Sequence, residues 1–262
     1  MRSSATNPLY YNPATTYKPW LKKDGTRFPD QNPAAARQTP ETSVTTARNL
    51  VADQSYNTNW CVGLSNANCT TSNKTLYQAK YYNYNGGSVT NIASYTEVKI
   101  ATGNNYAKAA TRTDCAAATT CTFAEESRNF ANWYSYHRNR MRVAIAGTAE
   151  AFYTVPESFR VGYGRINKTS TANIDGFTIR TIEKGVRPFE VSAAGTKGTF
   201  YDSLHLRTGS GSTPLRRAMD DVGQYYSYVD QKGPWGETPG TNNATAAVAC
   251  RRSFHVMMTD GL

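Results

Sequence analysis

The apolar stretch Phe254–Met258 places the strongest constraint on the fold of this chain. It is almost unbroken apolar sequence, which suits a strand buried on both faces of a parallel sheet. Asp260 and Gly261 follow it closely, so a carboxylate stands at the carboxyl end of the expected strand. Open α/β sheets bind their ligands at that edge. We therefore expect an α/β domain with a site at Asp260, and we expect this domain to extend beyond the 262 residues.

Apolar periodicity upstream of this stretch predicts further helices and strands. A possible capping box, Thr122 with Glu125, precedes apolar residues at helical spacing, which predicts one long helix over about 123–153. Two strands, near 159–163 and over 177–183, and a short helix near 199–206 follow. With the helix described next and the strand at 254–258, the order is that of an α/β domain.

Thr213 and Pro214 predict the start of the next helix. Threonine before proline is a typical pairing of N-cap and first helical residue. The expected apolar stripe of this helix consists of Leu215, Met219, Val222 and Tyr226.

Residues 1–122 are irregular and β-leaning. The segment Asn85-Gly86-Gly87 lies between two strand-like stretches, 75–84 and 88–101, and predicts a hairpin. This region contains four of the five cysteines, in two close pairs, Cys61 with Cys69 and Cys115 with Cys121.

Neither cysteine pair has the C-x2-C spacing of zinc ligands. We expect two local disulfides, formed in an oxidising compartment. Cys250 is left over, and we expect it to be available to a cysteine outside this chain.

The charge pattern indicates a basic exterior without a specific nucleic-acid site. The net charge is +10, but no run of Lys and Arg is longer than two residues. No stretch approaches the roughly 20 apolar residues of a membrane span. No signal peptide opens the chain, so we expect an export signal upstream.

Catalytic motifs are weak. Asp202, Ser203 and His205 cluster on one short predicted helix, whereas a productive triad needs partners from separate elements. The loop before Thr213 lacks the lysine of a phosphate-binding motif. We predict that the chain is not an enzyme; a hydrolase using His205 is the weakest hypothesis.

Short motifs are spread over nearly the whole chain, namely Asn7–Pro13, Thr16–Trp20, Asn129–Tyr136, Arg160–Gly164 and Cys250–His255. These motifs resemble the PilY family of type IV pilus assembly and tip-adhesin proteins. Thr213-Pro214-Leu215 and Thr259-Asp260-Gly261 are similar to the second and third parts of a von Willebrand factor A metal-ion-dependent adhesion site.

The resemblance implies a fold class and two metal ligands. The fold is an incomplete von Willebrand A-like (Rossmann-like) α/β domain over 123–262, lacking its first and C-terminal strands, with a β-rich disulfide-bearing insertion over 1–122. Thr213 and Asp260 would ligate a divalent cation, Mg²⁺ or Ca²⁺. The family's Asp-x-Ser-x-Ser motif is absent, and the near match that begins at Asp53 lacks the strand and helix around it, so we expect the site to be incomplete.

The implied function is non-enzymatic. It is type IV pilus biogenesis and adhesion at the pilus tip, with minor pilins and a host or surface ligand as partners, at the cell surface after export through the periplasm. The alternative is an extracellular carbohydrate- or matrix-binding module, suggested by the many tyrosines and by Trp20, Trp60 and Trp235.

Overall fold

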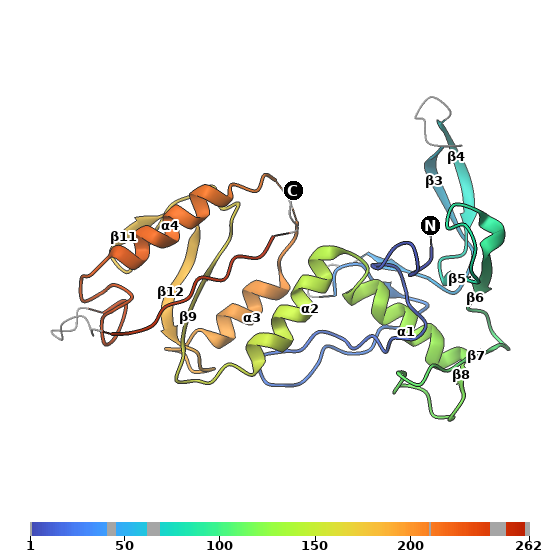
Figure 1. The fold of residues 1–262 in the computed structure, drawn as a ribbon, viewed down its shortest axis with the longest axis horizontal. Helices are drawn as coiled ribbons and strands as arrows, with labels where there is room; N and C mark the ends of the chain where they lie inside the picture. Colours follow the sequence, from blue (N-terminus) through green and yellow to red (C-terminus); the bar gives the residue numbers. More distant parts are fainter. Residues whose placement is uncertain (1, 41–45, 62–68, 210, 242–249, 260–262) are drawn as a thin grey trace. The chain divides into compact units, whose positions relative to one another are not determined.

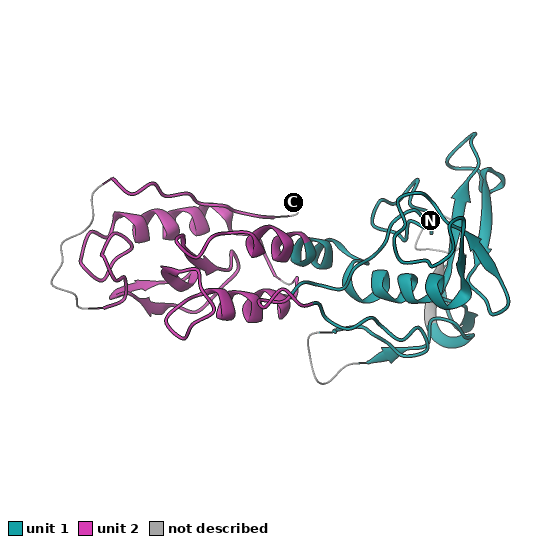
Figure 2. Cartoon of the chain, turned by 90° about the horizontal axis from the view of Figure 1, so that it is seen from below, with its two compact units in different colours: residues 1–21, 27–146 teal, residues 22–26, 147–262 magenta. Residues whose placement is uncertain are grey.

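The computed structural model describes residues 2–40, 46–61, 69–209, 211–241 and 250–259. The chain divides into two compact units (Figure 2). Unit 1 comprises residues 1–21 and 27–146, and unit 2 comprises residues 22–26 and 147–262. None of the helices in the described part of the chain has the length and apolar character needed to cross a lipid bilayer.

The described residues of unit 1 form four two-stranded antiparallel sheets and one complete α-helix (Figure 1). The paired strands are β1 (Ala36–Arg37) with β2 (Ala47–Arg48), β3 (Gln54–Cys61) with β4 (Cys69–Leu76), β5 (Lys80–Tyr84) with β6 (Tyr95–Lys99), and β7 (Asn105–Ala107) with β8 (Thr120–Thr122).

The hairpin predicted around Asn85-Gly86-Gly87 is confirmed, with different limits. Strands β5 and β6 pair from Lys80↔Lys99 to Tyr84↔Tyr95, and a short 3-10 helix, η2 (Ile92–Ser94), lies within the connecting loop. Gly86 and Gly87 have φ values of +99° and +93°, a region that favours glycine. Residues 75 and 76 belong instead to β4.

The core of unit 1 forms against helix α1 (Phe123–Tyr136). The predicted capping box is present, because Thr122 and Glu125 each accept a hydrogen bond from the other's backbone N–H. Phe130 and Trp133 on the inner face of α1 pack against Tyr11, whose ring centroid lies 5.0 Å from that of Phe130. An aromatic cluster therefore holds α1 to the N-terminal segment.

The prediction of a single helix over 123–153 is wrong. Helix α1 (Phe123–Tyr136) ends, and α2 (Arg140–Tyr153) begins after three intervening residues. The side chain of Asn139 accepts a 3.0 Å hydrogen bond from the backbone N–H of Arg142. An asparagine cap satisfies an N–H group that a new helix leaves free, so the break is locally stabilised.

The part of unit 2 that the structure describes contains two antiparallel strand pairs and two α-helices besides the end of α2. Strand β9 (Arg160–Gly164) pairs with β12 (Ile182–Pro188), and β10 (Ala172–Ile174) pairs with β11 (Phe177–Ile179). The helices are α3 (Lys197–His205) and α4 (Leu215–Ser227). The strand predicted near 159–163 and the short helix near 199–206 are confirmed, whereas the strand predicted over 177–183 is divided between β11 and β12.

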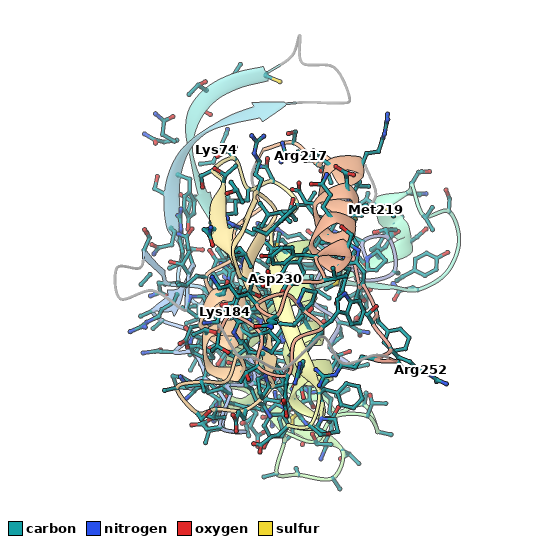
Figure 3. The ribbon with its side chains drawn as sticks, turned by 90° about the vertical axis from the view of Figure 1, so that its left-hand side faces the viewer. Lys74, Lys184, Arg217, Met219, Asp230 and Arg252 are labelled. Carbon is teal, nitrogen blue, oxygen red and sulfur yellow. A yellow bond between two sulfur atoms is a disulfide. The ribbon has the colours of Figure 1, made fainter. Side chains whose placement is uncertain are left out.

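Helix α4 starts one residue later than its sequence predicts. Its N-cap is Pro214, which makes no side-chain cap bond, and Thr213 lies exposed before the helix. Ala218 and Tyr225 are the buried residues of α4, while Met219 is 60% exposed and lies on the outer side of the helix (Figure 3). The buried face of α4 therefore contains Ala218 and Tyr225, whereas Met219, which the predicted apolar stripe placed on that face, is exposed.

The prediction of a buried strand at Phe254–Met258 is wrong. Residues 250–259 contain no strand, and Phe254 and Val256 are each 76% exposed. A buried strand needs neighbouring strands to bond its backbone and apolar side chains to cover both faces, and this segment has neither in the described structure. All described strand pairs are antiparallel, so a mixed α/β fold is observed and the parallel, von Willebrand A-like sheet is not shown.

The compact units and the predicted domains divide at different places. The units divide after Ala146, within α2, whereas the sequence places a boundary after residue 122. Helix α1 stays in unit 1 because its buried face forms part of the core there. The division into an insertion over 1–122 and an A-type domain over 123–262 remains a prediction.

Candidate functional site

The two predicted metal ligands are not brought together in the described structure. Thr213 is exposed before α4, and Asp260 lies outside the described residues. Among the residues that the structure does describe, no three His, Cys, Asp or Glu side chains gather as metal ligands. The cation site at Thr213 and Asp260 remains a prediction.

The local cluster at the end of α3 does not form a catalytic triad. The hydroxyl of Ser203 donates to Glu183 at 3.3 Å. Asp202 forms an exposed ion pair with Lys23 at 3.7 Å, and His205 is buried. Ser203 is therefore held by Glu183 and by Arg207, which also pairs with Glu183.

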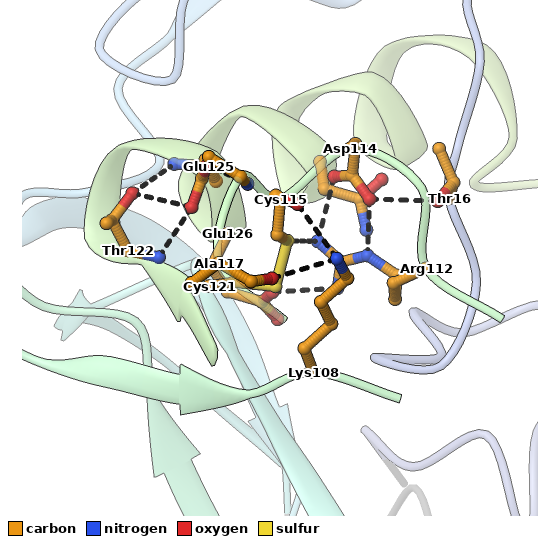
Figure 4. Close-up of a disulfide and its surroundings, with 12 residues drawn as sticks. Thr16, Lys108, Arg112, Asp114, Cys115, Ala117, Cys121, Thr122, Glu125 and Glu126 are labelled. Carbon is orange, nitrogen blue, oxygen red and sulfur yellow. Dashed lines mark hydrogen bonds and ion pairs between the residues drawn. A yellow bond between two sulfur atoms is a disulfide. The ribbon is translucent and has the colours of Figure 1, made fainter. Parts of the chain in front are cut away.

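A buried ionic network lies at the start of α1 in unit 1 (Figure 4). The guanidinium of Arg112 contacts Glu126 at 2.8 Å and Asp114 at 2.6 Å. The side chains of Arg112 and Glu126 are 0% and 1% exposed. Tyr11 donates a 2.8 Å hydrogen bond to Glu126, and Thr16 donates one of 2.8 Å to Asp114.

The network shifts the pKa values of its members in different directions. Burial raises the pKa of Glu126, although the neighbouring Arg112 opposes this effect. Burial alone would lower the pKa of Arg112. Its hydrogen bond with Asp114 and the nearby acidic groups have the larger combined effect, so the pKa is raised above its ordinary value. For Asp114 the hydrogen bonds from Arg112 and Thr16 outweigh burial and lower the pKa. Arg112 is thus a permanent positive charge that joins two carboxylates.

The disulfide Cys115–Cys121 closes the loop beside this network (Figure 4). It confirms one of the two predicted pairs. In the other predicted pair, the backbone register of β3 and β4 sets Cys61 opposite Cys69. Cys69 is disulfide-bonded, but the side chain of Cys61 is not among the described side chains. Cys250 is free and exposed.

A small polar pocket adjoins the network. Its volume is about 100 Å³, below the range of about 300–1,000 Å³ that is usual for organic ligands. Asp30, Asp114, Glu125, Arg128, Asn129 and Asn132 supply its polar lining. Asn129 is held by its own hydrogen bonds, since its amide donates to Tyr11 and to the carbonyl of Thr15. This pocket belongs to the structural network.

A larger pocket of about 430 Å³ lies elsewhere in unit 1. It is lined by residues from β2, β3, the end of β4, the link from β4 to β5, and α1, namely Arg48, Tyr56, Asn57, Leu76, Gln78 and Tyr134. The guanidinium carbon of Arg48 lies 4.8 Å from the ring centroid of Tyr56. A stacked guanidinium of this kind keeps its N–H edge open for a further partner.

Most aromatic residues that suggested a carbohydrate-binding exterior are structural. Trp20 is 1% exposed and donates a 2.8 Å hydrogen bond to the carbonyl of Tyr136. Trp235 is half-buried and donates to the carbonyl of Tyr226, and the side chain of Trp60 is outside the described ones. Many tyrosines are buried too, and Tyr56 and Tyr134, which the sequence did not single out, are the aromatic residues that line the larger pocket.

Comparison with known proteins identifies relatives along the whole chain. No protein-family model and no solved structure matches it. The type IV pilus biogenesis factor PilY1 of Pseudomonas aeruginosa strain PAK is 29% identical over 272 residues, which cover 99% of this chain. The chain is a homologue of PilY1.

Two further PilY1 sequences show the same similarity. PilY1 of Pseudomonas aeruginosa PAO1 is 28% identical over 99% of this chain, and PilY1 of strain UCBPP-PA14 is 29% identical over all of it. The chain spans only about a fifth of these relatives, 20–21% of their length. The resemblance seen in the sequence motifs is confirmed, and it concerns one part of PilY1.

Proposed function

We propose that this chain serves type IV pilus biogenesis as a non-enzymatic part of a PilY1-like protein. The observation that carries the proposal is the 29% identity to a named pilus biogenesis factor along 99% of the chain. Because the similarity extends over both compact units, it concerns the whole chain rather than one motif.

A location at the cell surface or pilus tip fits the covalent structure. The Cys115–Cys121 disulfide is of the kind that forms in the periplasm or outside the cell and is rare in the cytosol. We extend the proposal to adhesion at the pilus tip, with minor pilins and a surface ligand as partners. The PilY1 relatives are named for biogenesis, so adhesion is the further step.

The test of this function is genetic. The gene that encodes this chain is deleted in its own bacterium, and surface pili are counted by electron microscopy while attachment to a surface is measured. We expect loss of pili, restored by the wild-type gene. Normal piliation after the deletion would refute the biogenesis role, whereas normal pili with lost attachment would support adhesion alone.

A divalent cation at Asp260 and Thr213 is part of the adhesion proposal. Calorimetry with Mg²⁺, Mn²⁺ and Ca²⁺ would compare the wild-type chain with Asp260→Ala and with Asp202→Ala, which removes an exposed carboxylate elsewhere. Binding that is lost only in Asp260→Ala would support the site. Equal binding in all three proteins would place the cation elsewhere, and equal absence of binding would show that the chain takes up none; both results would refute the site at Asp260.

A further inference from the structure

We infer that the pocket at Arg48 and Tyr56 binds a carboxylated sugar. The inference does not rest on the proposed pilus function, because it concerns a pocket that lies within unit 1 and can be tested on the isolated chain. With a volume of about 430 Å³, the pocket falls within the size range of small-molecule sites.

The polar groups of this pocket lack partners within the described structure. Arg48 has neither an ion pair nor a hydrogen bond from its guanidinium there, only its stacking on Tyr56. The hydroxyl of Tyr56 is buried without a hydrogen-bond partner. Burying such a group unpaired costs free energy that a ligand would recover, so these groups point to an absent partner.

A carboxylate is the partner that Arg48 favours. Guanidinium binds carboxylates through two parallel N–H···O bonds, and stacking on an aromatic ring holds the guanidinium plane in place. Lys74 stands opposite Tyr56 in the β3–β4 register and adds positive charge on the same face of the hairpin. The overall charge of +10 further favours an anionic ligand.

The remaining lining fits a sugar better than a simple acid. Tyr56 and Tyr134 provide aromatic rings on which the C–H face of a pyranose can pack. The side-chain amide of Gln78 has no hydrogen-bond partner in the described part of the chain, and an amide both donates to and accepts from hydroxyl groups. One guanidinium, two rings and one amide together match a sugar with one carboxylate and several hydroxyls.

Binding is measured by NMR titration of the 262-residue chain with methyl glucuronide and with methyl glucoside, which lacks the carboxylate. We expect the glucuronide to bind about tenfold more tightly, as a charge-assisted hydrogen bond predicts. Arg48→Gln should remove this preference, while Arg216→Gln, an exposed arginine of α4, should keep it.

The substitution Tyr56→Phe tests ligand binding independently of protein stability. Because the hydroxyl of Tyr56 has no partner in the protein, its removal should leave the unfolding midpoint unchanged or higher. The same substitution should weaken glucuronide binding by a few-fold. A loss of binding without a loss of stability would support the site, and unchanged binding would count against it.

Further titrations identify the source of the carboxylated sugar. A methyl sialoside serves as the probe for sugars of animal cell surfaces, and methyl glucuronide serves as the probe for acidic polysaccharides. The probe that binds with the higher affinity indicates the source of the natural ligand. Equal binding of glucuronide and glucoside, no binding of any sugar, or tighter binding of an acetylated glutamate peptide would overturn the inference.

Discussion

Tyr11 donates a 2.8 Å hydrogen bond to Glu126, although the two residues lie 115 positions apart in the sequence. The second carboxylate oxygen of Glu126 accepts a 2.8 Å bond from Arg112. One buried side chain in the first turns of α1 thereby joins the N-terminal segment and the disulfide loop to the helix. A buried charge is tolerated only when it is paired in this way.

Glu126→Ala should destabilise the protein by about 3–5 kcal/mol, because it removes one of the two carboxylates that pair with the buried Arg112 and takes away the acceptor of the Tyr11 hydroxyl. Urea unfolding followed by circular dichroism measures the change. Glu97→Ala is the control, since Glu97 pairs with Lys80 at the surface and such pairs contribute about 0–1 kcal/mol. Equal losses in the two variants would show that burial of the Arg112–Glu126 pair is unimportant.

The capping box should make stability depend on pH. Backbone N–H groups of Thr122 and Ala116 donate to the carboxylate of Glu125 and lower its pKa. A lowered pKa in the folded state means that the ionised carboxylate stabilises the fold above its unfolded pKa of about 4.3 and that this contribution disappears as the pH falls through the folded value.

Wild type and Glu125→Gln should therefore differ in free energy of unfolding at pH 7 and converge on acidification. Unfolding in urea at a series of pH values from 7 to about 3 measures the difference. Glu157→Gln, an exposed change outside any helix or strand, should run parallel to wild type. A constant offset for Glu125→Gln at every pH would contradict the prediction.

Loss of the Cys115–Cys121 disulfide should lower stability by about 2–3 kcal/mol, because the crosslink closes a short loop in the unfolded chain. The double variant Cys115→Ser with Cys121→Ser is compared with wild type in urea under oxidising conditions. Cys250→Ser serves as the control, since Cys250 is free and exposed. An unchanged unfolding midpoint in the double variant would show that the loop is already restrained without the crosslink.

Tyr225→Phe should destabilise unit 2 by about 1–3 kcal/mol. The hydroxyl of Tyr225 donates to Asp175 at 2.6 Å and accepts a 3.0 Å bond from the backbone N–H of Val186. Phenylalanine leaves the backbone N–H of Val186 unpaired and removes one donor from Asp175, which keeps its ion pair with Arg187. Tyr228→Phe keeps its ring against Phe177 and should be neutral, because its hydroxyl has no hydrogen-bond partner in the described structure. The two variants are compared by urea unfolding, and a neutral Tyr225→Phe would contradict the prediction.

Local features were predictable from the sequence because their partners lie close together in it. The capping box joins Thr122 to Glu125, three residues apart, and the confirmed disulfide joins cysteines six residues apart. The hairpin at Gly86 and Gly87 follows from the backbone freedom of glycine. In each case short-range geometry is sufficient.

Apolar patterns proved less reliable where burial depends on neighbours. Phe254 and Val256 suggest a buried strand, yet both are exposed, since no described strand pairs with this segment. Met219 suggests the inner face of α4 but lies outside it, because Tyr225 fixes which face of the helix packs against the strands. Hydrophobicity shows that a residue can be buried, and only packing shows whether it is.

The sequence by itself determined the family resemblance, the start of α1 and the Cys115–Cys121 crosslink, all of which depend on residue identity and short spacing. Tertiary structure alone decided the pairing of Tyr11 with Glu126 and the meeting of Arg48 with Tyr134 at one pocket. These contacts join segments far apart along the chain. Nothing in their spacing specifies them, because they form only when the aromatic core of unit 1 packs around α1.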